Sequence, residues 1–306
     1  MHGILLVDKP EGVSSGLVVH IVKNRVKPAK VGHSGTLDPA ATGLMVVLVG
    51  AATRALDYLD EHRKAYSMTV LLGEETDTCD RDGTVISTED PSGIVLADVE
   101  RAVEKYRGVI DQVPPHFSAV KKDGVPLYKL ARKGELVDLP PRKVEIFSLE
   151  VVGWEPPLLA MELVCSKGTY ARSLARDLGR DLGVGARLEA LRRTASGQFE
   201  VSQAATLEEV SQGGKDFIGP RLIDLPQALA HIPDLPAVPG QIRKLMSGNP
   251  VTVSRTGVPF PEQSPNRLAR LFKVVGGDGA VVILVSLRPK GSDLALQPVR
   301  VLSTYQ

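Results

Sequence analysis

Residues 32–43 have the sequence GHSGTLDPAATG and join a predicted helix to a predicted buried strand. Glycine permits backbone geometries that other residues resist, and aspartate and proline favour turns, so we expect a loop that can hold a side chain against a ligand. Asp38 is the single carboxylate of this loop, and His33 lies near its start. Composition alone favours a turn-forming role for Asp38 and a packing or surface role for His33.

Apolar periodicity on either side of the loop predicts a mixture of strands and helices. Ser14 and Ser15 suit the start of a helix, and Thr206 with Glu209 has the spacing of a capping box. The apolar face of the first helix is expected to comprise Leu17, Val18, Ile21 and Val22. The expected strands include residues 3–8, 43–49 and 66–72, and the expected helices include 14–22, 99–106, 171–182 and a short helix from 206.

A cluster of prolines between residues 220 and 239 predicts a linker near residue 230, because proline interrupts both helix and strand. We therefore divide the chain into 1–230 and 231–306. The second part is predicted to hold a helix at 241–246 and several short strands. It has nine Lys and Arg against four Asp and Glu, whereas the first part has 28 against 32. This positive charge indicates either an anionic partner such as nucleic acid or simply a solvated face.

The overall composition excludes several classes of protein. With 43% hydrophobic and 24% charged residues, the chain has an ordinary globular balance. Its longest apolar stretch, residues 44–52, is far too short to span a bilayer, and no basic segment precedes an apolar one at the N-terminus. We therefore expect a soluble, cytoplasmic protein. Cys79 and Cys165 lack C-x-x-C spacing, which suits a reducing compartment and offers no zinc site.

Six groups of residues between residue 4 and about residue 200 carry a family resemblance. The groups are LLVDKP at 5–10 with Gly12 and 14–15; the loop at 32–43; KAY at 64–66 with 72–73 and TDTCD at 76–80; QVPP at 112–115 with FSAVK at 117–121, Gly124, Tyr128 and 131–132; CSKGTYAR at 165–172; and LRRT at 191–194 with 196–197. In this order they resemble the motifs of the TruB family of tRNA pseudouridine-55 synthases.

The resemblance implies a fold and a reaction. The implied fold is α+β, with a mixed, largely antiparallel sheet flanked by helices, an RNA-gripping insertion at about 120–145, and a PUA-like β pseudo-barrel over 231–306. The implied reaction isomerises uridine 55 in the T loop of tRNA after the base is flipped from its stack. The bond from C1′ to N1 breaks and the base rejoins through C5. No cofactor, metal or obligatory protein partner is expected, and the expected partner is the T arm of tRNA.

The resemblance also assigns catalytic residues. Asp38 matches the nucleophile; a carboxylate can attack either C6 of the base or C1′ of the sugar and later leave. The sequence leaves both routes open. Arg172 matches the arginine that pairs with this carboxylate, and a nearby cation keeps a carboxylate ionised. Thr169 is a candidate N-cap that would place Arg172 in the first turn of a helix. Tyr66 matches the tyrosine that stacks on the target base.

Further residues are expected to bind the substrate. Asp80 matches a polar partner near the base and the arginine, while Tyr170 and Leu191 match residues that line the uracil pocket. His33 matches a histidine close to the displaced nucleotide. The expected phosphate contacts are Lys9, Lys64, Lys121 and Arg132, with Lys122, Arg142 and Lys143 as further candidates.

Two alternatives to a stand-alone enzyme stay open. The first is a guide-dependent relative, the catalytic subunit of H/ACA ribonucleoproteins. The lack of long basic tails in this sequence argues against it. The second is an RNA-binding protein or tRNA folding chaperone that needs no chemistry. Intact residues at the positions of Asp38, Tyr66 and Arg172 favour the enzyme.

Overall fold

The computed structural model describes residues 1–59, 63–117, 139–255, 271–276 and 279–303, together with the backbone of 121–122 and 125–126. The helices of this part are α1 (Ser15–Val26), α2 (Leu96–Glu104), α4 (Ala171–Asp181), α5 (Leu207–Ile218), α6 (Leu225–Ala228) and α7 (Pro239–Met246). The strands of its first 230 residues are β1 (Gly3–Lys9), β2 (Val31–His33), β3 (Thr42–Val49), β4 (Arg63–Leu72), β5 (Glu74–Thr76), β6 (Val85–Thr88), β7 (Gly108–Gln112), β8 (Lys121–Lys122), β9 (Val125–Pro126), β10 (Arg142–Glu155), β11 (Leu158–Ser166), β12 (Ala186–Ser196), β13 (Phe199–Glu200) and β14 (Ala205–Thr206).

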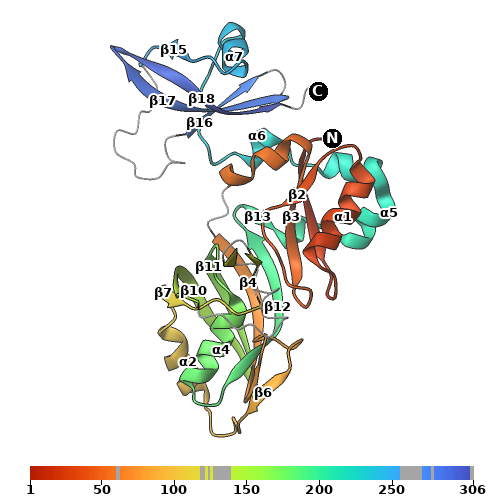
Figure 1. Cartoon of the computed structure of the whole chain (residues 1–306), viewed down its shortest axis with the longest axis vertical. Coiled ribbons are helices and arrows are strands. Elements are labelled where there is room, and N and C mark those ends of the chain that lie inside the picture. The colour runs from red at the N-terminus through yellow and green to blue at the C-terminus, as the bar shows by residue number, and fades with distance from the viewer. Residues whose placement is uncertain are drawn as a thin grey trace.

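Ten of the described strands form one large sheet. Its order is β14-β1-β3-β12-β4-β11-β10-β7, with β2 added to β3 and β13 added to β12. β12 runs parallel to β3, and β1 runs parallel to β14, whereas the other pairs of this sheet are antiparallel. Figure 1 shows α1 and α5 side by side near β2 and β3, and α2 and α4 near β7 and β10. The expected α+β fold, with a mixed, largely antiparallel sheet flanked by helices, is therefore confirmed.

Local sequence signals set the start and the buried face of α1. Ser14 is its N-cap, and the Ser14 hydroxyl accepts a hydrogen bond from the backbone N–H of Leu17 at 3.2 Å. The expected apolar face is wrong at Leu17, which is 46% exposed. The buried stripe runs instead through Val18, Val22 and Val26, because four-residue steps keep side chains on one side of a helix.

Two further local predictions are confirmed. Thr206 caps α5, and Glu209 returns the bond to the backbone N–H of Thr206 at 2.8 Å, which completes a capping box. Alternate residues of β4, from Tyr66 to Leu72, are buried, as the period of two predicts. These residues join the main hydrophobic core, which lies between the large sheet and the helices α1, α2, α4 and α5.

The C-terminal part is a small antiparallel sheet. Its strands are β15 (Val251–Val253), β16 (Leu271–Gly276), β17 (Val281–Lys290) and β18 (Asp293–Ser303), paired in the order β15-β18-β17-β16. The hairpin of β17 and β18 is longer than the sequence predicts, since ladder pairs continue from Val281 with Ser303 to Lys290 with Asp293. The expected glycine-rich turn between β16 and β17 includes 277–278, which lie outside the described residues.

The proline-rich stretch before this sheet is packed. Leu225, Leu229 and Ile232 are buried in a core that joins β1 and β3 to the C-terminal strands. Lys273 of β16 donates through its ammonium to the carbonyl of Ile232 at 2.6 Å and pairs with Asp234 at 3.3 Å. The two parts therefore share a hydrophobic core, and the division at residue 230 stays a prediction.

No helix among the described residues combines the length and the apolar character needed to cross a bilayer. Cys79 and Cys165 are both buried and unbonded to each other, and no group of three or more His, Cys, Asp or Glu within this part is arranged to hold a metal ion.

Candidate active site

The loop between β2 and β3 is fixed on both sides of Asp38. The buried hydroxyl of Ser15, at the start of α1, donates to the carbonyl of Leu37 and accepts from its N–H, both at 2.8 Å. On the other side, the N–H of Gly12 donates to the carbonyl of Pro39 at 2.9 Å. Because both neighbours are held by distant parts of the chain, the backbone of Asp38 has little freedom to move.

Lys9 is a further anchor of this loop, and the expected phosphate contact is wrong. Its side chain is fully buried, and its ammonium donates to the carbonyls of Pro10, Val13 and Pro39 at 2.8–3.1 Å. Burial lowers the pKa of Lys9 to about 8, against the attraction of Asp38. A cation enclosed in this way cannot reach a phosphate, so Lys9 shapes the loop instead.

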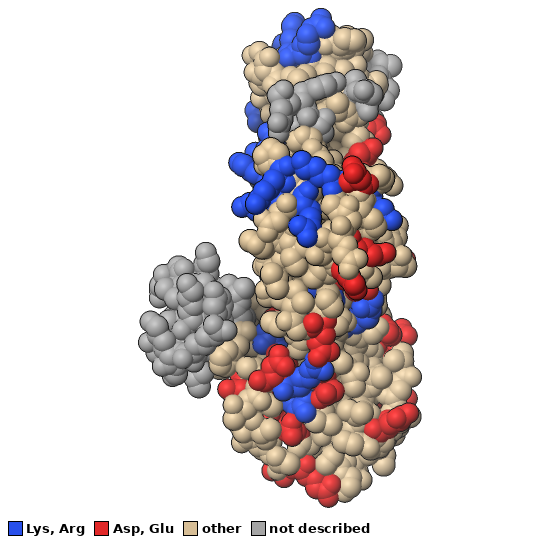
Figure 2. All heavy atoms as spheres, turned by 90° about the vertical axis from the view of Figure 1, so that its right-hand side faces the viewer, with Lys and Arg blue, Asp and Glu red and all other residues tan. Residues whose placement is uncertain are grey.

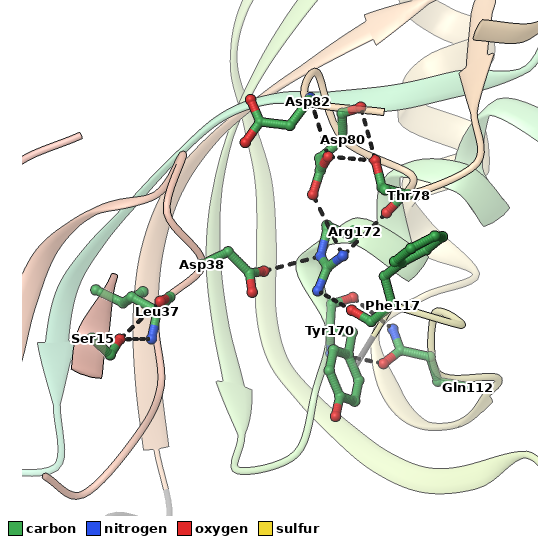
Figure 3. A network of polar contacts seen from close by, with 10 residues as sticks. All are labelled: Ser15, Leu37, Asp38, Thr78, Asp80, Asp82, Gln112, Phe117, Tyr170 and Arg172. Carbon is green, nitrogen blue, oxygen red and sulfur yellow. Dashed lines mark hydrogen bonds and ion pairs between the residues drawn. The ribbon is translucent and has the colours of Figure 1, made fainter. Parts of the chain in front are cut away.

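Arg172 joins two carboxylates from separate segments, as Figure 3 shows. Its Nε lies 3.0 Å from Oδ2 of Asp38, and its Nη1 lies 3.4 Å from Oδ2 of Asp80. The guanidinium also donates to the carbonyls of Thr78 and Phe117 at 3.2 and 3.0 Å. The Arg172 side chain is 7% exposed, whereas that of Asp38 is 44% exposed. The arginine is thus locked in place while the carboxylate stays accessible.

The start of α4 places Arg172, one residue away from where the sequence predicts. The N-cap is Tyr170 rather than Thr169, and the Thr169 hydroxyl donates instead to the carbonyl of Ser166 at 2.9 Å. Arg172 still lies in the first turn, where the helix dipole disfavours a cation. The carboxylates of Asp38 and Asp80 offset that cost.

Asp80 is held by its own turn. The Thr78 hydroxyl donates to Oδ1 of Asp80 at 2.6 Å, and the backbone N–H of Asp82 donates to the same oxygen at 3.2 Å (Figure 3). Burial raises the pKa of Asp80, while the Thr78 bond and the charge of Arg172 oppose that rise. These two bonds hold Oδ1 and leave Oδ2 for Arg172. The predicted partnership of Asp80 and Arg172 therefore exists.

A cavity of about 610 Å³ opens beside these groups. It brings together most of the residues that the sequence predicts for the site. Those that line it are Asp38, Lys64, Tyr66, Asp80, Tyr170, Arg172 and Leu191. Tyr66, which belongs to β4, forms part of the cavity wall. Burial raises the pKa of its hydroxyl, so the phenol is neutral at neutral pH.

Tyr170 is positioned by Gln112, a residue to which the sequence assigned no role. The buried Gln112 amide accepts from the N–H of Tyr170 at 2.8 Å and donates to its carbonyl at 3.1 Å (Figure 3). These two hydrogen bonds to the backbone of Tyr170 fix the chain just before Arg172. Gln112 belongs to the QVPP motif, but nothing in that motif indicates a contact with residue 170.

Arg193 is the second residue that sequence reasoning missed. It is 1% exposed, and it donates to the carbonyls of Leu44 and Gly35 at 2.6 and 3.1 Å. Its backbone lies against Gly43 through the parallel pairing of β12 and β3. Gly43 has a φ of +99°, and a Cβ there would lie 2.3 Å from the carbonyl oxygen of Arg193. Glycine is therefore required at position 43, and Arg193 ties both ends of the loop to β12.

His33 is not among the residues that line the cavity. It ends β2, and its buried Nδ1 has no hydrogen-bond partner within the described part of the chain. Burial lowers the pKa of His33, and the charges of Arg193 and Lys64 lower it further, so the ring is neutral at neutral pH. A contact between His33 and a displaced nucleotide stays a prediction.

The remaining basic residues are predicted phosphate contacts. Lys64 lines the cavity, and Lys143 on β10 is exposed and pairs with Asp111 at 3.3 Å. The side chain of Lys121 and all of Arg132 lie outside the described residues. The last residues of the expected insertion at about 120–145 belong to β10, which begins at Arg142.

Comparisons with known proteins place the chain in a family. Residues 23–171 match the N-terminal domain of the TruB family of pseudouridylate synthases, and residues 172–215 match the C-terminal domain of tRNA pseudouridylate synthase B. The tRNA pseudouridine synthase B of Syntrophotalea carbinolica is 44% identical over 82% of both chains. The chain belongs to the TruB family.

Other TruB relatives match an even longer part of the chain. The tRNA pseudouridine synthase B of Chromohalobacter salexigens is 37% identical and aligns with 99% of this chain and 94% of its own length. Among solved structures, one chain of a Cbf5-Nop10-Gar1 complex matches with a TM-score of 0.70 and 23% sequence identity. The match covers 98% of this chain and 84% of that chain. At that identity the likeness shows the fold alone, and it extends through the C-terminal sheet.

Proposed function

We propose that this TruB enzyme isomerises uridine 55 in the T loop of tRNA to pseudouridine, with Asp38 as the nucleophile and without a cofactor. The observation that carries the proposal is the accessible Asp38 carboxylate, which lies at a 610 Å³ cavity and is held 3.0 Å from the buried Arg172. Relatives that align with most of the chain bear the name tRNA pseudouridine synthase B.

The cavity has a size suited to a flipped nucleotide. A uridine must leave its stack before Asp38 can reach it, at a cost of a few kcal/mol. The ring of Tyr66 and the side chain of Leu191 line the same cavity and offer apolar contact to the extruded base. We assign Tyr66 to stacking, because its raised pKa disfavours the phenolate that general-base chemistry would need at neutral pH.

The reaction conserves all atoms. The Asp38 carboxylate adds to C6 of the base or to C1′ of the sugar, the bond from C1′ to N1 breaks, and the base turns within the cavity. A bond then forms from C1′ to C5, the proton on C5 leaves, and N1 takes a proton. A carboxylate bonded to C1′ is displaced as the bond from C1′ to C5 forms, whereas one bonded to C6 departs afterwards and restores the double bond of the ring. Arg172 pairs with Oδ2 of Asp38 and fixes it, which leaves Oδ1 for the new bond.

The proposal extends to the partner and to the parts of the chain. The T arm of tRNA is the proposed ligand, with Lys64 at the cavity and Lys121 and Arg132 of the insertion as phosphate contacts. We also propose that residues 1–230 form the catalytic unit and that 231–306 form a PUA-like RNA-binding unit, in a cytoplasmic enzyme that needs no protein partner.

One experiment tests this function directly. The purified protein is incubated with an unmodified tRNA transcript, without guide RNA or cofactor, and pseudouridine is mapped at single-nucleotide resolution. We expect product at uridine 55 alone, and none from Asp38→Asn. Tight tRNA binding without product would favour a pure RNA-binding role, and product only after addition of a guide RNA would favour the H/ACA-type alternative.

A further inference from the structure

A group of lysines lies at the end of α1 that is remote from Asp38. Lys23 and Lys27 are one helical turn apart, and Lys30 follows before β2. Lys27 and Lys215, which belongs to α5, line a hollow of about 260 Å³ with Val26, Pro28 and Ala29. We call these four exposed lysines, Lys23, Lys27, Lys30 and Lys215, the α1–α5 patch.

The four lysines of the patch carry positive charge without acidic partners in the described part of the chain. None of its four lysines pairs with a carboxylate of the described residues. Elsewhere, surface cations such as Lys105 and Lys143 pair with Asp181 and Asp111. Figure 2 shows a group of Lys and Arg at the height of α1 and α5, with Asp and Glu beside it toward the right of the view. The patch is thus a local surplus of charge on a chain whose net charge is only +1.

The contacts of α1 relate the patch to the active site. Ser15 at one end bonds to Leu37, the neighbour of Asp38, and Val26 at the other end lines the patch hollow. The 12 residues of α1 span about 18 Å at 1.5 Å per residue. A duplex with the rise of B-form DNA, about 3.4 Å per base pair, covers that distance in roughly five steps, and the A-form helix of RNA takes a few more. The helical part of an RNA whose loop enters the cavity is long enough to reach the patch.

We infer that the α1–α5 patch is a second RNA-binding surface, which contacts backbone phosphates of the tRNA outside the loop that enters the cavity. The inference rests on the proposed tRNA substrate. Exposed lysines with no acidic partner suit phosphates, because they attract them without reading base sequence. The hollow that Lys27 and Lys215 line has room for a phosphate group, to which both ammonium groups can donate. The patch adds affinity and orientation, and it takes no part in the chemistry.

The test compares two double variants with two RNAs. Lys27→Gln with Lys215→Gln removes the charges that flank the hollow, and Arg101→Gln with Lys105→Gln removes two charges from α2 as the matched control. Binding is measured against salt concentration with full-length tRNA and with a stem-loop that carries the target loop on four base pairs. All of these side chains are exposed, so the fold is expected to persist, which circular dichroism verifies.

We expect the patch variant to bind tRNA about tenfold more weakly and to lose about 1.5 to 2 from the slope of log K against log salt. Its affinity for the stem-loop, and both affinities of the control variant, should equal those of the unaltered protein. An unchanged tRNA slope would overturn the inference, as would an equal loss with the stem-loop or with the control. Failure of the proposed function looks different, because no pseudouridine would then form in any RNA with the unaltered protein.

Discussion

Cationic residues lie in opposite environments at the catalytic loop, which contacts the start of α1, and at the far end of the same helix. Around the loop that Ser15 anchors, the cations Lys9, Arg172 and Arg193 are almost fully buried, and their N–H groups bond to carbonyls or carboxylates. Near Val26, the lysines of the α1–α5 patch are exposed and have no carboxylate partner among the described residues. Lysine and arginine therefore hold the catalytic loop at one end of α1 and present exposed positive charge at the other end, about 18 Å away along the helix.

The difference shows what burial does to a charge. A buried cation is costly unless its donors are satisfied, so a substitution at the Ser15 end leaves unpaired groups and disturbs the geometry around Asp38. An exposed lysine keeps its water shell and meets phosphate through a salt-dependent attraction. Changes at the first end should alter the rate of the chemistry, and changes at the second should alter only affinity.

The largest effect is expected from Asp38→Asn. The amide keeps the shape of the side chain but cannot act as a nucleophile, so single-turnover product formation should fall by at least about 10⁴-fold. Arg172 keeps its bonds to Asp80 and to two carbonyls, so the site should stay folded. Filter binding should give a tRNA affinity within about threefold of the unaltered protein. Retention of full activity would exclude Asp38 as the nucleophile.

A smaller loss is expected from Arg172→Lys. A lysine ammonium cannot reproduce the planar fork that reaches two carboxylates and two carbonyls, so the substitution is not conservative here. We expect kcat to fall about 100-fold and the urea midpoint to decrease, because Asp80 is left buried without its full partner. Arg180→Lys, on the exposed end of the same helix, is the control and should leave kcat unchanged. Equal kcat values for the two variants would contradict the role of Arg172.

Signals confined to a few neighbouring residues predicted the structure well. The caps at Ser14 and Thr206 and the alternation from Tyr66 to Leu72 depend on contacts within one turn or one strand. The loop at 32–43 was predicted from its own composition. Even here the exact pattern erred, since Leu17 is exposed and α4 begins after Tyr170. Helix boundaries depend on tertiary contacts, which a short segment does not contain.

The anchors of the site were beyond local reasoning. Gln112 and Tyr170 are 58 residues apart, and Arg193 and Gly35 are 158 apart, so their bonds exist only after the sheet has formed. Lys9 was predicted to contact phosphate, which requires an exposed ammonium. Three carbonyls that turn toward its ammonium make the burial tolerable, and no sequence pattern reveals them. The catalytic residues themselves were predicted only through the family resemblance.

The pH dependence of stability tests the burial of Lys9. Its pKa in the folded protein is lowered to about 8 from the ordinary value of 10.5. Between these values the unfolded chain binds more protons than the folded one, so this group makes the free energy of unfolding rise with pH. Urea unfolding at several pH values from 7 to 10 should show a smaller rise for Lys9→Met than for the unaltered protein. Identical pH slopes would mean that Lys9 titrates normally and is hydrated.

The smallest effect is expected from two adjacent serines at the start of α1. Ser14→Ala removes the helix cap and should cost about 1 kcal/mol of stability without changing kcat. Ser15→Ala removes both bonds to Leu37 and should cost a similar amount, but it also frees the backbone beside Asp38. A small displacement of a reacting group lowers its rate, so kcat should fall about tenfold with KM unchanged. Because the two variants weaken the same helix start, only a difference in kcat isolates the anchor of the loop. Equal kcat values would show that Lys9 and Arg193 suffice to hold it.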